Sequence, residues 1–102
     1  MAAQSPAVEA AIRIGVDIIR RHLPDPAVRI FLFGSRARGS AHERSDIDIG
    51  VEGPRPIDHA TLAAIIEETD ESPTLYSIDV VDFKRLPERF RDVALEATVE
   101  IA

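Results

Sequence analysis

The sequence has no cysteine and no tryptophan, and it has one tyrosine and one methionine among its 102 residues. The absence of cysteine excludes disulfide bonds, thiolate-based zinc sites and a thiol nucleophile. No apolar run approaches the roughly 20 residues that a helix needs to cross a bilayer. The first residues also lack the basic stretch and apolar core of a signal peptide. These absences favour a cytoplasmic protein without membrane contact.

Positive charge is also scarce, because 12 Lys and Arg residues against 18 Asp and Glu residues give a formal net charge of −6. Affinity for nucleic acid rests mainly on Lys and Arg that neutralise phosphates, so direct nucleic-acid binding is not expected. A single nucleoside triphosphate needs only a local cluster of cations or metal ions, and this class of ligand stays open. The length predicts one domain over residues 1–102.

Hydrophobic periodicity predicts alternating helices and strands. An apolar stripe indicates a helix over residues 6–23, with Ser5 as its N-cap and Pro6 at its first position. The other expected elements are strands over 28–33, 46–51 and 75–83, helices over 59–70 and 86–97, and a tail that is either a short strand or a frayed end. The short link between the first two strands permits an antiparallel pair. We therefore expect an α/β (α+β) fold, in which helices pack on a small mixed sheet.

The tetrapeptide that begins at Asp46 is the most informative in the chain. Because side chains alternate along a strand, Asp46 and Asp48 project from one face while Ile47 and Ile49 enter the core. Adjacent carboxylates repel each other unless water or a cation screens them. Mg²⁺ is a hard ion that takes such oxygen ligands. An Asp-x-Asp pair standing alone is more often a solvated strand face, so its meaning depends on what accompanies it.

Gly34 and Ser35 directly follow the first buried strand. Glycine lets the backbone turn sharply and approach a ligand closely. The Ser35 hydroxyl and the amides of the turn can donate to phosphate oxygens. Arg36 and Arg38 add cations beside the turn. Taken alone, this segment fits a plain turn with solvated arginines equally well.

A third acid is expected from the strand over residues 75–83, which contains Asp79 and Asp82. The two acids are three positions apart and face opposite sides, so only one can join the first pair. Asp79 lies in mid-strand between apolar residues, where a buried charge is costly unless it serves a metal or acts as a base. Asp82 lies at the strand end, where a solvated or helix-capping role is easier. We therefore expect Asp79 in the site.

Gly34-Ser35 followed after ten residues by Asp46-x-Asp48 resembles the signature of the DNA polymerase beta-like nucleotidyltransferase superfamily. The string GSRARGSAHERSDIDIGV is similar to its minimal nucleotidyltransferase (MNT) branch. Members of that superfamily place a nucleoside monophosphate from ATP or another triphosphate on an acceptor hydroxyl and release pyrophosphate. The resemblance implies the nucleotidyltransferase fold, with two Mg²⁺ ions (Mn²⁺ as an alternative) and ATP as substrate. It assigns catalysis and metal binding to Asp46, Asp48 and Asp79, and nucleotide binding to Gly34, Ser35, Arg36 and Arg38.

The resemblance also implies a partner. MNT proteins are often paired with HEPN-domain proteins in toxin–antitoxin modules, where the MNT antitoxin can transfer AMP to a tyrosine of the toxin. The chain after Asp48 is too short for the second domain with which larger relatives hold their acceptor. Two alternatives stay open: an antitoxin that acts by binding and occlusion, and a transferase for a small molecule such as an aminoglycoside.

The remaining polar and aromatic candidates are given structural or solvated roles. His22 ends a helix, where a cation meets the helix dipole favourably, and His42 and His59 are expected to be solvated. Tyr76 is expected at a strand edge. The acidic run over residues 67–71 is expected to be a solvated helix end, with docking of a basic partner as the alternative.

Overall fold

Helices and strands alternate along the chain much as the periodicity predicts. The structure is a computed structural model that describes residues 5–42 and 44–102. Its elements are α1 (Pro6–His22), β1 (Arg29–Phe33), α2 (Ser35–Arg38), β2 (Ile47–Glu52), α3 (His59–Asp70), β3 (Ile78–Asp82), α4 (Glu88–Leu95) and β4 (Val99–Glu100). The Ser5 side chain caps α1 by accepting the Val8 amide at 3.2 Å. The third strand is shorter than expected, because Thr74 Oγ1 accepts the Tyr76 amide and bends the chain before Ile78.

The strands form one mixed sheet in the order β3-β2-β1-β4. β2 pairs antiparallel with β1 and parallel with β3, whereas β4 pairs antiparallel with β1. The mixed sheet and the antiparallel first pair are therefore confirmed. The C-terminal tail, which the sequence left open between a strand and a frayed end, supplies the edge strand β4.

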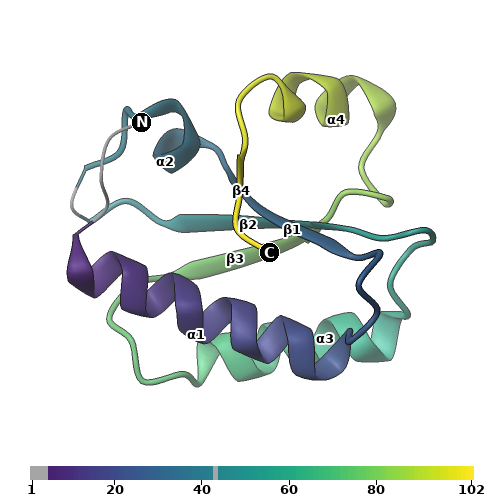
Figure 1. Ribbon diagram of the computed structural model, residues 1–102, viewed down its shortest axis with the longest axis horizontal. Coiled ribbons are helices and arrows are strands. Elements are labelled where there is room, and N and C mark those ends of the chain that lie inside the picture. Colours follow the sequence, from purple (N-terminus) through teal and green to yellow (C-terminus); the bar gives the residue numbers. More distant parts are fainter. Residues whose placement is uncertain (1–4, 43) are drawn as a thin grey trace.

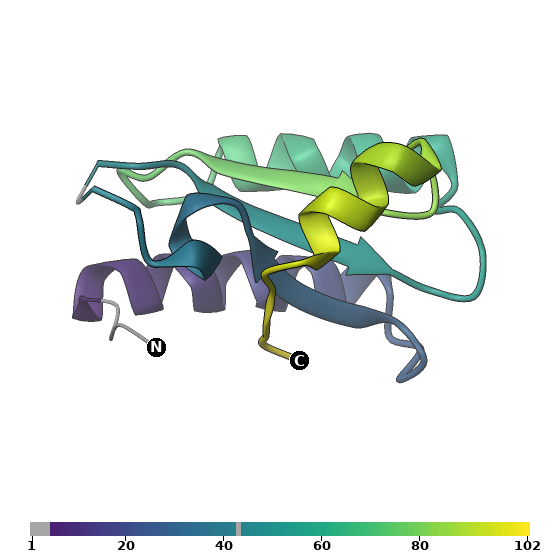
Figure 2. The ribbon, with the colours of Figure 1, turned by 90° about the horizontal axis from the view of Figure 1, so that it is seen from above.

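Two helices cover one face of this sheet and two lie on the other side. α1 and α3 lie together below the strands, while α2 and α4 lie above them (Figure 1). Seen from above, α2 and α4 are apart from each other over different ends of the sheet (Figure 2). The main core lies between the sheet and α1, where a side chain at Gly15 would come within 2.9 Å of Ile49. Its fully buried members include Ile19, Ile30, Ile47, Ile49, Val51 and Ile65.

The upper face of the sheet carries a smaller aromatic cluster. Phe83 packs edge-to-face against Phe31 and Phe33, with ring centroids 4.8 and 5.0 Å apart. α4 contributes little to this packing, because none of its residues is buried and Phe90 and Val93 are 66% and 63% exposed. Much of the upper face near α2 is therefore free to carry polar groups. In the part of the chain that the structure describes, no helix is long and apolar enough to span a membrane.

Candidate active site

The turn after β1 is built on glycine backbone geometry. Gly34 has φ 70° and ψ −151°, a conformation that is essentially restricted to glycine. It ends β1 and lets Ser35 begin the single helical turn α2. Gly39 closes that turn in the left-handed region with φ 78°, and its amide donates to the Ser35 carbonyl. The loop after β1 thus contains one helical turn with a glycine at each end.

The two halves of the sequence motif are in contact. In the β1–β2 pairing Phe33 lies opposite Asp48, so Gly34 passes directly beside the Asp48 side chain. A Cβ atom added to Gly34 would stand 2.3 Å from Asp48 Oδ2. Only a residue without a side chain allows the turn to lie this close to the carboxylate. The backbone turn and the acid therefore form one surface.

A second carboxylate lies beside Asp48. The parallel register of β2 and β3 pairs Asp48 with Asp79, so both side chains project from the upper face of the sheet. Asp46 immediately precedes β2 and is exposed. Burial raises the pKa of the Asp48 carboxyl above its ordinary value, and the charges of Asp79 and Asp46 raise it further. The structure thus brings together the three acids that the sequence singled out.

Asp79 and Asp82 differ from expectation in their burial, because Asp79 is exposed and Asp82 is buried. Asp79 is exposed on the open face of the sheet rather than buried among apolar neighbours. Asp82 is the buried acid, with its side chain 1% exposed. Its oxygens accept the amides of Ile57 at 2.7 Å and Lys84 at 3.0 Å, and Arg85 lies 3.5 Å away. The expected solvated role of Asp82 is wrong, because the loop before α3 and the turn after β3 both bond to its carboxylate.

The two loop arginines have different surroundings. Arg36 is 5% exposed, donates to the Ser45 carbonyl at 2.6 Å and lies over the Tyr76 ring at 5.5 Å. It therefore braces the loop between the two halves of the motif, which the sequence alone did not indicate. Arg38 is exposed. Both guanidinium groups oppose the rise in the pKa of Asp48, so their positive charge acts on this carboxylate.

The carboxylates suit a hard cation. Among the described residues, no three His, Asp or Glu side chains are grouped tightly enough to hold a metal by themselves. Mg²⁺ usually takes only one or two carboxylates and completes its octahedron with water and substrate phosphates. Asp48 and Asp79 lie in register, and burial together with the charges of Asp79 and Asp46 raises the pKa of the Asp48 carboxyl. This donor set fits Mg²⁺ carried with a nucleotide.

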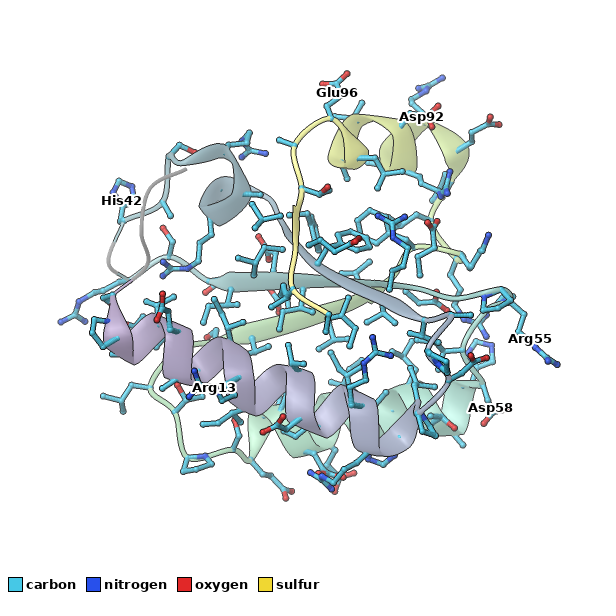
Figure 3. All side chains as sticks on the ribbon, viewed as in Figure 1. Arg13, His42, Arg55, Asp58, Asp92 and Glu96 are labelled. Atoms are coloured by element: carbon cyan, nitrogen blue, oxygen red, sulfur yellow. The ribbon has the colours of Figure 1, made fainter. Side chains whose placement is uncertain are left out.

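Tyr76 lies closer to the site than its expected role at a strand edge suggested. Besides contacting Arg36, it lines a pocket of about 450 Å³ together with Arg44, Asp46 and Ser77. The signal for this position was weak, since a lone tyrosine before a strand carries no motif. The His42 side chain instead points outward from its loop (Figure 3), as a solvated residue does.

Comparison with known proteins gives one family. The family model described as polymerase beta, nucleotidyltransferase matches residues 17–102. A Haemophilus influenzae protein described as a probable protein adenylyltransferase, MntA, is 30% identical over 84 residues, which are 82% of this chain and 72% of that protein.

Solved structures agree with this result. A structure described as a candidate minimal nucleotidyltransferase has a TM-score of 0.67 at 26% identity, and the match covers 92% of each chain. A chain from the complex of a tri-AMPylated Shewanella oneidensis HEPN toxin with MNT antitoxin has a TM-score of 0.65 at 17% identity. That match covers 90% of this chain and 69% of the other, and its likeness is one of fold. The expected fold and the resemblance drawn from the sequence are confirmed. The chain belongs to the polymerase beta nucleotidyltransferase family, as a minimal nucleotidyltransferase.

Proposed function

We propose that this protein is a metal-dependent transferase that moves AMP from ATP to a hydroxyl of a HEPN-type toxin and thereby neutralises the toxin. The observation that carries the proposal is the contact between the Gly34 turn and Asp48, with Asp79 in register beside it. A phosphate-binding turn and a carboxylate pair are what a phosphoryl-type displacement needs side by side.

The residues of the turn after β1 have separate roles in nucleotide binding. Gly34 leaves room for the terminal phosphates beside Asp48, and the amide and hydroxyl of Ser35 donate to their oxygens. Arg38 offsets the charge that develops on pyrophosphate as it leaves. Arg36, which donates to the Ser45 carbonyl and lies over the Tyr76 ring, braces the loop beside the phosphate site.

The three acids hold the metals and manage the proton. Asp46, Asp48 and Asp79 would bind two Mg²⁺ ions, which neutralise the attacking and leaving oxygens when bound. Asp79 faces solvent and takes the proton of the acceptor hydroxyl. A new bond forms between that oxygen and the α-phosphorus, the bond from the α-phosphorus to the bridging oxygen breaks, and pyrophosphate leaves with the electron pair.

The relatives support a protein hydroxyl as the acceptor. The MntA relative is described as a probable protein adenylyltransferase, and the fold is shared with an antitoxin bound to an AMPylated HEPN toxin. Transfer to a protein hydroxyl also suits the exposure of Asp46 and Asp79. Both proteins would meet in the cytoplasm, where ATP is available.

The proposal is tested with ATP labelled on the α-phosphate and a purified HEPN-domain toxin. We expect Mg²⁺-dependent label on the partner from α-labelled but not γ-labelled ATP, abolished by EDTA. Asp48→Asn should lower the rate by at least about 10²-fold, because it removes transition-state charge stabilisation. Asp92→Asn is the matched control, since this acid points outward from α4 (Figure 3).

The outcomes separate the competing functions. If the toxin is bound and silenced equally by the wild type and by Asp48→Asn, without label, neutralisation is by occlusion and the proposal is wrong. If label passes from ATP to an aminoglycoside but not to the toxin, the reaction stands and the acceptor is wrong.

A further inference from the structure

We propose that the acceptor reaches the active site as an extended peptide segment that pairs with the free edge of β3. The inference rests on the proposed function, because it names how the substrate of that same site is held. It commits to one occupant: an extended segment in which the reacting tyrosine has a basic residue on one side and an apolar residue on the other.

Within residues 5–42 and 44–102, no strand pairs with the outer edge of β3. β3 is an edge strand, with β2 on its inner side only. Ile47 N donates to the Ser77 carbonyl at 2.8 Å, and Phe83 N donates to the Val51 carbonyl at 2.9 Å. In a parallel ladder this alternation directs the peptide groups of Asp79 and Val81 toward β2, and those of Ile78 and Val80 away from the sheet. Such an edge is a template for an added strand.

The same edge carries the reacting group. Asp79 lies between Ile78 and Val80, and its side chain projects from the upper face beside Asp48. On an added strand, side chains alternate between the two faces. A tyrosine paired at the level of Asp79 therefore presents its hydroxyl on the upper face, next to the two acids. Backbone pairing alone would place the acceptor oxygen where Asp79 can take its proton.

A groove continues from the acids around this edge to α3. It has a volume of about 470 Å³ and is lined by residues that include Asp48, Asp79, Val80, Ile66 and Asp70. Ile66 is 39% exposed, unusual for a large apolar residue on a helix that packs against the sheet. It offers an apolar contact to a side chain on the lower face of the added strand.

The acidic end of α3 favours a basic residue as the second neighbour of the tyrosine. Asp70 ends α3 within the groove, and Glu71, the C-cap residue of α3, follows it. These carboxylates are separate from the three acids assigned to the metals, so the metals would not neutralise them. A Lys or Arg next to the tyrosine, on the face that meets α3, is complementary to Asp70. The acidic end of α3 thus acquires the docking role that the sequence left as an alternative.

The test uses a synthetic nine-residue peptide with a central tyrosine flanked by valine and arginine, at millimolar concentration. Its matched control has the same side chains but N-methyl groups on the tyrosine and its two neighbours, which removes backbone donors. With Mg²⁺ and α-labelled ATP we expect kcat/KM at least tenfold lower for the methylated peptide. The reaction joins the tyrosine oxygen to the α-phosphorus, releases pyrophosphate and leaves the proton on Asp79.

Two further measurements test docking independently of the comparison between the methylated and unmethylated peptides. Hydrogen exchange of the Val80 amide should slow at least tenfold when the unmethylated peptide is added without nucleotide. Asp70→Lys should lower kcat/KM for the arginine peptide at least tenfold, whereas Asp92→Lys, the same charge change on α4, should not. Equal labelling of the two peptides, or an unprotected Val80 amide, overturns the docking proposal. If the whole toxin is still labelled in that case, the transferase function stands; if the toxin is also unlabelled, both fail.

Discussion

Gly34 shows how one backbone position links the two halves of the site. Its φ of 70° and its contact with Asp48 are separate demands, and each excludes a side chain. Gly39 shares the first demand with φ 78°, but a Cβ there would meet no atom within 4 Å. Alanine at either position would strain the backbone, whereas only alanine at Gly34 would also displace Asp48. Comparing the two variants therefore distinguishes the effect of strain from the effect of moving the carboxylate.

We expect Gly34→Ala to lower the rate of label transfer about 10²-fold, because even a 1 Å shift of a catalytic group can have that effect. Gly39→Ala should reduce the free energy of unfolding by about 1 kcal/mol from left-handed strain and leave the rate within about twofold. Initial-rate assays and denaturant titrations check the two effects. Equal losses of rate in both variants would show that the Asp48 contact is unimportant.

Asp48 is held in an unfavourable place for a charge. Burial and the neighbouring Asp79 and Asp46 raise the pKa of its carboxyl, so at neutral pH the ionised side chain destabilises the folded protein. In a chelating buffer we expect Asp48→Asn to have a higher Tm than the wild type at pH 7. The gap should close as pH falls below the ordinary carboxyl pKa, where the acid is protonated in both folded and unfolded states. A variant less stable than the wild type at pH 7 would contradict the conclusion that burial and the neighbouring acids make this charge unfavourable.

At the scale of elements, α1 and α3 are joined on the lower face by polar contacts as well as by the core. Glu68 of α3 accepts from Arg21 at 2.7 Å and lies 2.6 Å from His22 Nε2. The bonds from His22 and Arg21 lower the pKa of Glu68. Ionised Glu68 therefore stabilises the pair of helices above its ordinary pKa, and this contribution is lost as pH falls through the lowered value.

Removing that link should have a small, pH-dependent effect. We expect Glu68→Gln to lower Tm slightly at pH 7, and the difference to vanish in strong acid and to shrink in high salt, because the pair is solvent-exposed. Thermal unfolding followed by circular dichroism at several pH values checks this. A Tm difference that stays constant from pH 7 into strong acid would show that the contact acts through packing.

At the scale of the whole molecule, local patterns predicted the elements and the acids because both depend on periodicity. Because side chains alternate along β2, Asp48 projects from the face of the sheet opposite to that of its buried neighbours Ile47 and Ile49, as expected. The surroundings of Asp79 and Asp82 were not predictable in this way. They depend on which sheet face receives both α1 and α3, and on the loop that brings Ile57 to Asp82.

The contacts of Arg36 could not be predicted from the sequence for the same reason. Its contacts with Ser45 and Tyr76 join segments 9 and 40 residues away along the chain, and no local pattern encodes such a meeting. The bracing contacts of Arg36 were therefore not predictable, and its role in nucleotide binding stays a prediction.

We propose that the Gly34 turn, Asp48 and Asp79 form one site for a nucleotide and its metal ions. Titration of Mn²⁺ followed by electron paramagnetic resonance, with and without ATP, tests it most directly. We predict that ATP and Mn²⁺ strengthen each other's binding to the wild type and to Asp92→Asn, and that Asp48→Asn and Asp79→Asn each lose this coupling. ATP binding that is independent of Mn²⁺, or coupling unchanged in Asp48→Asn, would contradict the account.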